Sequence, residues 1–404
     1  MTISGSQLDH VEVDTPQGRS GTLQSARDEY FFTYAAQARA ASEISLTMPL
    51  RAQQYVSREL HPIFQMNLPE GYVLEQLRQR FAKASMLNPM LLLALTGSDS
   101  AIGRVSVSTP AVERPEFPRG ERLDAILAWD GAEDLFAELA DRYLLRSGAS
   151  GVQPKLLIPE DAGATGRASL VTRELIVKSE GEEFPGLAIN EYVSMCIARE
   201  AGIPVPEFHL SKNGKLFVMH RFDRTPDGAA LGFEDMAVLM GLPAASKYDA
   251  SYERIAKAIA LYCSPERQPA ALAQLFDQVL LSCMIGNGDA HLKNFGILYG
   301  DPHDEDVRLA PAYDIVNTTA YIPDDGLALQ LNGSKSLFAA RANLGTLADR
   351  CRVGNVGARI DALVQAAETV LARERDLLAQ EPRLEPAMRK GLQRFADDRR
   401  TRRG

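Results

Sequence analysis

The sequence lacks the features that mark secreted, membrane-spanning and zinc-binding proteins. It has 4 cysteines in 404 residues, and none stands at Cys-x-x-Cys or Cys/His ligand spacing, which argues against a zinc site. We expect them to be buried free thiols in a reducing compartment; they are Cys196, Cys263, Cys283 and Cys351. Residues 1–21 contain no apolar signal-peptide core. The longest apolar run, residues 90–95, is far shorter than the roughly 20 residues that cross a bilayer. The sequence therefore predicts a cytoplasmic protein with no membrane contact.

The sequence also lacks an excess of positive charge. Its 44 Lys and Arg residues against 53 Asp and Glu give a formal net charge of −9. This balance argues against broad, non-specific binding to nucleic acid. Basic residues do gather near the C-terminus, where a solvated tail is the expected outcome. They are Arg389, Lys390, Arg394, Arg399, Arg400, Arg402 and Arg403.

A short polar loop is the most informative stretch of the chain. Asp289 and Asn294 stand five residues apart, between Gly286 and the apolar run 295–299. The catalytic Asp and the Mg²⁺-binding Asn of protein kinases have the same spacing. A second carboxylate, Asp314, follows where an acid that holds the metal is expected. The Asp-x-x-x-x-Asn pattern alone is weak, because such pairs recur in surface turns where both side chains bond their own backbone.

The pattern of apolar residues predicts a strand-rich half followed by a helix-rich half. Short strands are expected over residues 156–158 and 175–178, and a helix over 187–200. Beyond residue 225 the periodicity becomes helical. The main helical segments are 252–262, 270–285 and 358–378. This layout predicts an α+β fold of the bilobal protein-kinase type, with a mixed α/β N-lobe, a mostly helical C-lobe and a nucleotide between them.

Other polar residues fit such a site, but each has an ordinary alternative. Lys178 ends a predicted strand, from which it could reach nucleotide phosphates, although a strand-end lysine in solvent is equally expected. Glu191 could pair with Lys178, although a glutamate on a helix surface is the commoner outcome. The small-residue loop 146–155 could bring backbone N–H groups to phosphate oxygens, yet it matches neither Gly-x-Gly-x-x-Gly nor a P-loop. His291 could contact phosphate or brace its own loop, and His220 stands where a hinge between lobes would contact adenine.

Several of these motifs, taken together, resemble those of the HipA family of bacterial toxin kinases. They are Ser-Gly-Val-Gln-Pro-Lys (150–155), Asn-Glu-Tyr (190–192), Arg-Phe-Asp-Arg (221–224), the loop 286–295 and Pro-Ala-Tyr-Asp (311–314). Residues 67–71 and 103–105 resemble the N-terminal subdomain of that family. Because the motifs occur in order over most of the chain, the resemblance is highly specific. It implies an extra N-terminal subdomain joined to the N-lobe.

The chain is accordingly expected to contain five regions. These are a flexible leader (1–25), which is either disordered or strand-forming, a HipA-type N-terminal subdomain (26–120), the remainder of the N-lobe with the phosphate loop (121–225), a helical C-lobe with the catalytic and metal-binding loops (226–380) and a basic C-terminal tail (381–404).

The resemblance implies a role for each matching residue. Asp289 would be the catalytic base, and Asn294 and Asp314 would hold Mg²⁺. Lys178 would bind the phosphates of ATP, with Glu191 as its ion-pair partner. Further contacts to ATP would come from Ser150, Gly151, Val152, Gln153, Lys155, His220, Phe222, His291 and Lys293.

The resemblance also implies an activity and partners. Members of the family are serine/threonine protein kinases of toxin–antitoxin modules, and the known ones phosphorylate aminoacyl-tRNA synthetases. A HipB-like helix-turn-helix antitoxin neutralises them, and through this partner they reach operator DNA. They are also switched off by autophosphorylation of a serine in the phosphate loop.

The phosphate loop departs from the family pattern at one position. Gly148 stands where the modified serine usually lies, three residues before the Gly of the Gly-x-Gln-x-Lys core. Ser150 is therefore the better candidate for autophosphorylation, followed by Ser147. A phosphate with nearly two negative charges on this loop would repel the phosphates of ATP.

Two other functions remain open from the sequence. A small-molecule phosphotransferase of the aminoglycoside- or choline-kinase-like type would use the same Gly288-Asp289 and Asn294 elements. A catalytically silent co-repressor that binds the antitoxin would keep the fold without the chemistry. The joint presence of Lys178, Asp289, Asn294 and Asp314 favours an active enzyme.

Overall fold

The computed structural model describes residues 8–81, 87–97, 100–112, 120–130, 134–148, 153–161, 173–181 and 183–396. The chain divides into two compact units. The first unit comprises residues 1–179, 211–244 and 298–305, and the second comprises residues 180–210, 245–297 and 306–404. Each is described separately below. Both helices and sheets are present, so the predicted α+β class is confirmed.

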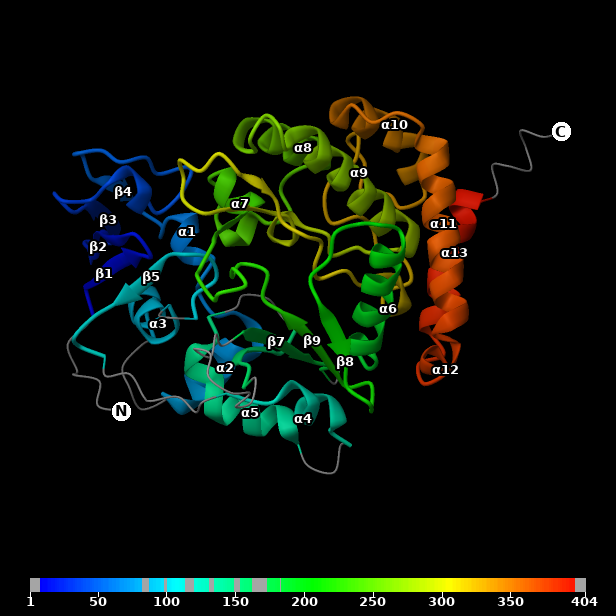
Figure 1. Ribbon diagram of the computed structural model, residues 1–404, viewed down its shortest axis with the longest axis horizontal. Helices are drawn as coiled ribbons and strands as arrows, with labels where there is room; N and C mark the ends of the chain where they lie inside the picture. Colours follow the sequence, from blue (N-terminus) through cyan, green and yellow to red (C-terminus); the bar gives the residue numbers. More distant parts are fainter. Residues whose placement is uncertain are drawn as a thin grey trace. The chain divides into compact units, whose positions relative to one another are not determined.

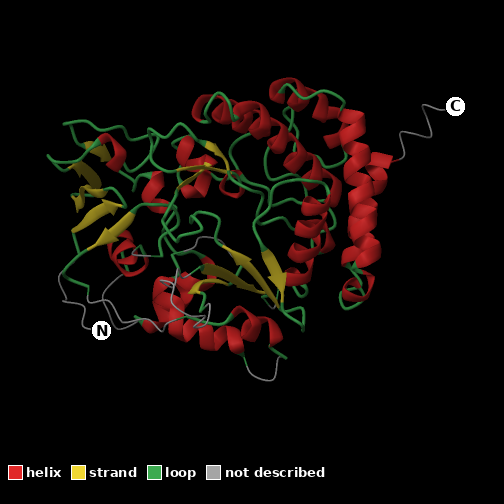
Figure 2. Ribbon diagram, in the orientation of Figure 1, coloured by secondary structure: helices red, strands yellow, loops and turns green. Residues whose placement is uncertain are grey.

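The first unit contains a five-stranded antiparallel sheet in the order β4-β3-β2-β1-β5, drawn in yellow in Figure 2. Its strands are β1 (His10–Thr15), β2 (Gly18–Ala26), β3 (Glu29–Tyr34), β4 (Tyr55–Ser57) and β5 (Ser106–Ser108). Of the two forms that the sequence leaves open for the leader over 1–25, the structure shows the strand-forming one from His10 onward, so a flexible leader is wrong there. Val11 and Val13 alternate with polar neighbours and are fully buried, and this period of two is the signature of a strand with one face in a core.

A second antiparallel set of strands in this unit carries the predicted phosphate-binding lysines. Its central strand β7 (Glu174–Ser179) pairs with β6 (Lys155–Pro159) on one side and with β9 (Leu216–His220) on the other. Apolar side chains of α4 (Leu123–Ala128) and α5 (Leu135–Tyr143) form one core with these strands. The strands predicted over 156–158 and 175–178 are thus confirmed.

The remaining elements of the unit are η1 (Ala40–Ser42), α1 (Pro62–Gln65), α2 (Gly71–Arg80), α3 (Pro89–Thr96), η2 (Leu144–Arg146), β10 (Gly232–Asp235) and α7 (Met236–Leu239).

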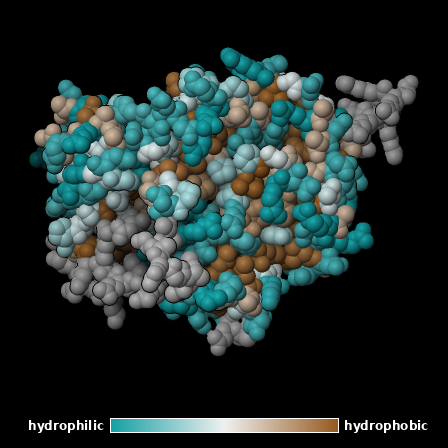
Figure 3. Space-filling view, in the orientation of Figure 1, coloured by the Kyte–Doolittle hydropathy of each residue, from teal (hydrophilic) through white to brown (hydrophobic). Residues whose placement is uncertain are grey.

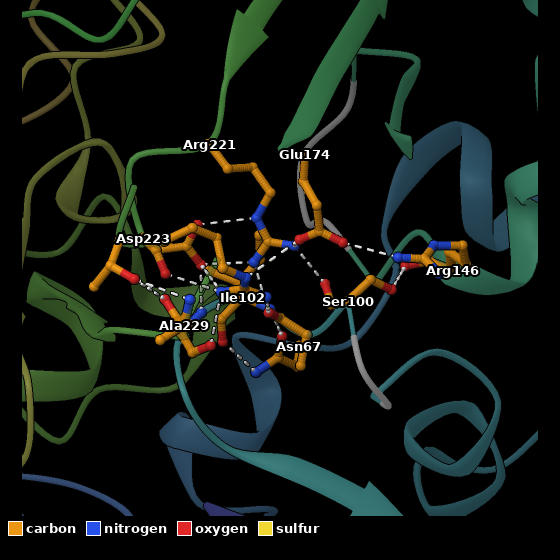
Figure 4. A network of polar contacts seen from close by, with 12 residues as sticks. Asn67, Ser100, Ile102, Arg146, Glu174, Arg221, Asp223 and Ala229 are labelled. Atoms are coloured by element: carbon orange, nitrogen blue, oxygen red, sulfur yellow. Dashed lines mark hydrogen bonds and ion pairs between the residues drawn. The ribbon is translucent and has the colours of Figure 1, made fainter. Parts of the chain in front are cut away.

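A buried ion network joins the N-terminal part of the first unit to strand β7 (Figure 4). Arg221, which follows β9, has a fully buried side chain that pairs with Asp223 at 2.6 Å and with Glu174 at 2.8 Å. Its guanidinium also donates to the carbonyl oxygens of Ser100 and Ala101, at 2.9 and 2.7 Å. These bonds satisfy donors that would otherwise be costly to bury.

Asp223 is the anion at the centre of this network. It accepts hydrogen bonds from the backbone of Gly103 at 2.7 Å and from Arg224 at 3.1 Å. Burial opposes its ionisation, but the charges of Arg221 and Arg224 outweigh that effect and lower the pKa of Asp223 to about 2. The motif 221–224 and the Gly103 turn, which sequence reasoning noted separately, are therefore parts of one structural anchor.

The second unit is built around α9 (Gln268–Ile285), which is buried along most of its length. In Figure 1 it lies beside α6 (Leu187–Glu200), α11 (Val356–Arg373) and α13 (Leu384–Ala396). The helices predicted over 187–200, 252–262 and 270–285 are confirmed, and the one predicted over 358–378 divides into α11 and α12. The other elements are β8 (Phe208–Leu210), α8 (Tyr252–Tyr262), η4 (Leu292–Asn294), β12 (Arg308–Leu309), η5 (Thr318–Ala320), α10 (Ala340–Cys351) and α12 (Arg375–Leu378). Two elements, η3 (Ala244–Ser246) and β11 (Gly296–Tyr299), each contain residues that are assigned to both units.

The predicted basic tail over 381–404 begins too early. Residues 384–396 form α13, and Leu384, Met388, Leu392 and Phe395 on that helix are buried. Their spacing places them on one face of a helix. Gly391 lets α13 approach α9 closely, because a Cβ there would lie 2.1 Å from the carbonyl oxygen of Met284. Of the basic residues assigned to the tail, Arg389, Lys390 and Arg394 thus belong to a packed helix.

The face seen in Figure 3 mixes hydrophilic residues with patches of hydrophobic ones. The large hydrophobic side chains exposed in the described part of the chain are Leu50, Val56, Tyr248, Leu261, Ile322 and Phe338. All four cysteines are buried and free, as predicted. Among the described residues, no helix combines the length and the apolarity that crossing a bilayer requires.

Candidate active site

The loop after α9 holds Asp289 in a fixed backbone position. Gly286 ends the helix in the left-handed conformation, with φ of 76°. The side-chain oxygen of Asn287 accepts from the backbone N–H of Asp289 at 2.9 Å. The side-chain amide of Asn294 donates to the carbonyl oxygen of Asp289 at 2.8 Å. Asp289 and Asn294, which the sequence pairs by spacing, are therefore in direct contact.

The carboxylate of Asp289 is half-exposed and has two aromatic neighbours. The hydroxyl of Tyr248 donates to its Oδ1 at 2.8 Å, and Nε2 of His291 lies 3.8 Å from the same oxygen. Burial, together with the charge of Lys247, lowers the pKa of His291 to about 3. His291 is therefore neutral near pH 7 and does not place a cation beside Asp289.

Asp314 lies on a second loop and faces the same cleft as Asn294. The cleft is lined by Gln278, Ser282, Asn287, Ala290, Asn294, Phe295, Ala312, Tyr313, Asp314 and Ile315. Asp314 has φ of 57°, a left-handed conformation that few residues other than glycine adopt. Such outliers persist where the surrounding structure enforces them, and they cluster at functional sites. The hydroxyl of Tyr313 donates to the carbonyl oxygen of Lys293 at 2.7 Å, which ties this loop to the one that carries Asp289.

Thr318 and Asn190 add further hydrogen bonds to the loops of this site. The sequence gives Thr318 no role, and it places Asn190 in a motif without a function. The backbone N–H of Thr318 donates to the carbonyl oxygen of Gly286 at 3.0 Å, and its hydroxyl accepts from the N–H of Gly288 at 2.8 Å. Asn190 on α6 exchanges two hydrogen bonds of 2.8 Å with the backbone of Asn317. Asn190 belongs to the Asn-Glu-Tyr motif (190–192), which points to it from the sequence, whereas Thr318 belongs to no motif.

The donor atoms at the cleft suit a hard divalent cation. Asn294 uses its amide nitrogen in the bond to Asp289, which leaves its amide oxygen as the ligand atom. Asp314 offers a carboxylate on the same cleft. Carboxylate and amide oxygens are the ligands that Mg²⁺ takes in proteins, whereas softer metals select sulfur and imidazole. Asn294 and Asp314 thus fit the predicted Mg²⁺ site.

The first unit holds the other candidates for binding ATP. Lys155 and Lys178 are opposite each other on β6 and β7, so both buried side chains lie on the same face. The predicted contacts of Lys155 and Lys178 with ATP stay predictions. Gln153 donates to the carbonyl oxygen of Ser179 at 3.3 Å.

The remaining predicted residues of this unit are partly explained by packing. His220 ends β9 and lies 3.1 Å from a carboxylate oxygen of Glu160. The ring of Phe222 packs edge-on against Phe233, with centroids 5.6 Å apart. Their predicted contacts with ATP stay predictions. Ser150, Gly151 and Val152 lie outside the described residues. Glu191, the predicted partner of Lys178, is buried on α6 in the other unit, and that pairing also stays a prediction.

Ser147 is a poor candidate for autophosphorylation in this conformation. Its side chain is fully buried. Its hydroxyl donates to the carbonyl oxygen of Tyr143 at 3.1 Å and accepts from the N–H of Leu157 at 2.9 Å. The serine therefore links the end of α5 to strand β6, and a phosphate would break both bonds. Ser150 is left as the candidate, as the sequence favours.

Replacing Gly286 by Ala should displace the loop that carries Asp289. The left-handed backbone costs a residue with a Cβ roughly 1–2 kcal/mol, and the added methyl group would lie 2.5 Å from Oγ1 of Thr319. We expect a lower melting temperature, measured by circular dichroism, together with loss of activity. Gly345, inside α10 with open space around it, is the matched control. Gly345→Ala should raise stability by roughly 0.5–1 kcal/mol. Equal effects of the two substitutions would contradict this account.

Comparison with known proteins agrees with these features. Residues 11–108 match the HipA N-terminal domain, and residues 147–372 match the HipA-like C-terminal domain. Two kinase candidates of Sinorhizobium fredii are similar in sequence. Y4dM is 30% identical, covering 69% of this chain and 67% of the relative, and Y4mE is 29% identical, covering 84% and 86%.

A solved structure is similar over almost the whole chain. It is the HipA of the Shewanella oneidensis toxin–antitoxin system, solved with HipB and operator DNA. It is 21% identical, covers 95% of this chain and 96% of its own, and superposes with a TM-score of 0.67. At this identity the likeness shows a shared fold. The two domain matches, in the order that the motifs predict, show that the chain belongs to the HipA family.

Proposed function

We propose that this chain is a serine/threonine protein kinase that transfers the γ-phosphate of Mg-ATP to a protein hydroxyl. The proposal rests on one observation: the loop that carries Asp289 and Asn294 and the loop that carries Asp314 line the same cleft. Asn294, in contact with Asp289, lines one cleft with Asp314. Membership of the HipA family and the naming of its relatives as kinase candidates support it.

In this mechanism the protein acts by positioning and electrostatics. Asp289 orients the attacking hydroxyl and accepts its proton. Asn294 and Asp314 would hold Mg²⁺, which when bound neutralises charge on the phosphates. Lys155 and Lys178 would bind the phosphates from the sheet of the first unit. His291 is neutral, so it does not attract the carboxylate of Asp289 away from the substrate. It can still take part in a hydrogen bond near the phosphate.

We further propose that the chain is the toxin of a HipBA-like module in the cytoplasm. The likeness to a HipA that was solved with HipB and operator DNA supports a helix-turn-helix antitoxin as partner. The resemblance to the family supports an aminoacyl-tRNA synthetase as substrate and Ser150 as the autophosphorylation site. The net charge of −9 fits contact with operator DNA through the antitoxin rather than through this chain alone.

Incubating the purified chain with γ-labelled ATP, Mg²⁺ and a cell extract tests the proposal. We expect label on a discrete protein band and on the chain itself, and phosphopeptide mapping should identify serine or threonine. Label in small solutes alone would favour a small-molecule phosphotransferase, and no transfer at all would favour a silent co-repressor.

Replacing Asp314 by Asn should weaken binding of Mg-ATP by at least about tenfold, because a charged metal ligand becomes neutral. Isothermal titration with ATP in the presence of Mg²⁺ or of EDTA measures the effect. The loss should appear with Mg²⁺ and largely vanish with EDTA. Asp324, an exposed carboxylate in the same unit, is the matched control, and Asp324→Asn should bind Mg-ATP like the parent. A loss that is equal with and without Mg²⁺ would rule out a metal-holding role.

A further inference from the structure

The base proposed for this site is held by a side chain that no motif includes. The hydroxyl of Tyr248 donates to Oδ1 of Asp289 at 2.8 Å, across 41 residues of sequence. An attacking hydroxyl must donate to this same carboxylate, since a general base has to lie within hydrogen-bond reach of the proton it takes. One oxygen of the carboxylate is therefore already engaged by the protein.

Contacts on several sides fix the position of Tyr248. Its ring meets the ring of His291 edge-on, with centroids 5.1 Å apart. The ammonium group of Lys335 donates to its carbonyl oxygen at 3.2 Å. The preceding residue, Lys247, accepts from the backbone N–H of Leu292 at 3.1 Å. The segment 247–248 is thus attached to the catalytic loop through both backbone and side chains, although the Tyr248 side chain is partly exposed.

We propose that Tyr248 is a positioning residue for phosphotransfer, which sets the orientation of the Asp289 carboxylate toward the attacking hydroxyl. The terminal torsion of an aspartate is broad and roughly two-fold, so that a hydrogen bond to one oxygen selects where the other points. The Asp289 side chain is 46% exposed, so packing restrains it less than it would a buried carboxylate. The inference rests on the proposed kinase function and deepens it.

The test is the substitution Tyr248→Phe in the full chain. Phenylalanine keeps the ring against His291 and removes only the hydroxyl. With Mg-ATP as the probe, the rates of phosphate release and of phosphate incorporation into the chain are measured at varied ATP concentration. We expect kcat to fall about tenfold with the KM for ATP unchanged within about twofold, because misorientation affects the reacting geometry rather than nucleotide binding.

The control is Tyr30→Phe, which deletes a phenol on β3 of the N-terminal sheet. It should leave kcat, KM and the melting temperature unchanged, and Tyr248→Phe should share the parent's melting temperature. Three results for Tyr248→Phe would overturn the inference. The first is an unchanged kcat, and the second is a raised kcat, which would mean that Tyr248 blocks the base. The third is a rise in the KM for ATP by the same factor as the fall in kcat. A parent chain that neither hydrolyses Mg-ATP nor incorporates phosphate refutes the proposed function itself, whereas an active parent with an unaffected variant refutes only the role of Tyr248.

Discussion

Asp289→Asn is expected to lower phosphotransfer by about 10²–10⁴-fold, the usual contribution of a general base. The amide keeps the shape of the side chain and can still accept from the hydroxyl of Tyr248, so the loop should hold its conformation. Binding of Mg-ATP should persist, because the Mg²⁺ ligands Asn294 and Asp314 are unchanged. Initial rates with labelled ATP and titration calorimetry of the same preparation measure the two properties separately.

An exposed aspartate provides the matched control for this substitution. Asp349 lies near the end of α10 in the same unit, and Asp349→Asn removes one negative charge without touching the cleft. It should retain the parent's activity. If Asp289→Asn kept the parent's activity, Asp289 would not be the base.

Asp223→Asn is expected to destabilise the first unit by about 3–5 kcal/mol, the cost of removing one partner from a buried ion pair. The substitution leaves the fully buried guanidinium of Arg221 with Glu174 as its remaining anion in the network. It also weakens the hydrogen bond to the Gly103 turn. Urea denaturation followed by circular dichroism measures the change in free energy of unfolding.

The pair Arg122–Asp124 is the control, because both of its side chains are exposed. Asp124→Asn should cost no more than about 1 kcal/mol, as exposed ion pairs do. Similar losses for the two substitutions would mean that burial does not set the strength of the network.

The contribution of Asp223 should also depend on pH. Its pKa is about 2 in the folded protein, against an ordinary 3.8. A carboxylate with a lowered pKa stabilises fully above its unfolded pKa, and this contribution is lost as the pH falls through the folded value. The stability difference between the parent and Asp223→Asn should therefore be constant from pH 7 to pH 5 and shrink by about 2 kcal/mol between pH 4 and pH 2. A difference that stayed constant down to pH 3 would contradict the assigned pKa.

The sequence was most informative where chemistry and periodicity are local. The helix over 187–200 was predicted with its observed ends, because Gly202 and two prolines stop the apolar pattern. Asp289 and Asn294 could be paired because one loop carries both, and their hydrogen bond follows from that short separation. For residues 1–25 the sequence leaves a disordered and a strand-forming leader open, because the segment is polar and contains glycine although Val11 and Val13 alternate with polar residues, and the structure decides for strands from His10 onward.

The sequence by itself determined the family, the α+β class and the loop that carries the candidate base. Those properties depend on residues that are near one another in the sequence, because each motif and each helix or strand pattern is contained in a short segment. The tertiary structure decided which distant groups meet. It placed Asp314 on the cleft of Asn294, buried Arg221 with Asp223 against the Gly103 turn, and brought Tyr248 to Asp289. These contacts depend on how helices and loops pack around α9 and on how strands pair in register, and no local pattern encodes that packing.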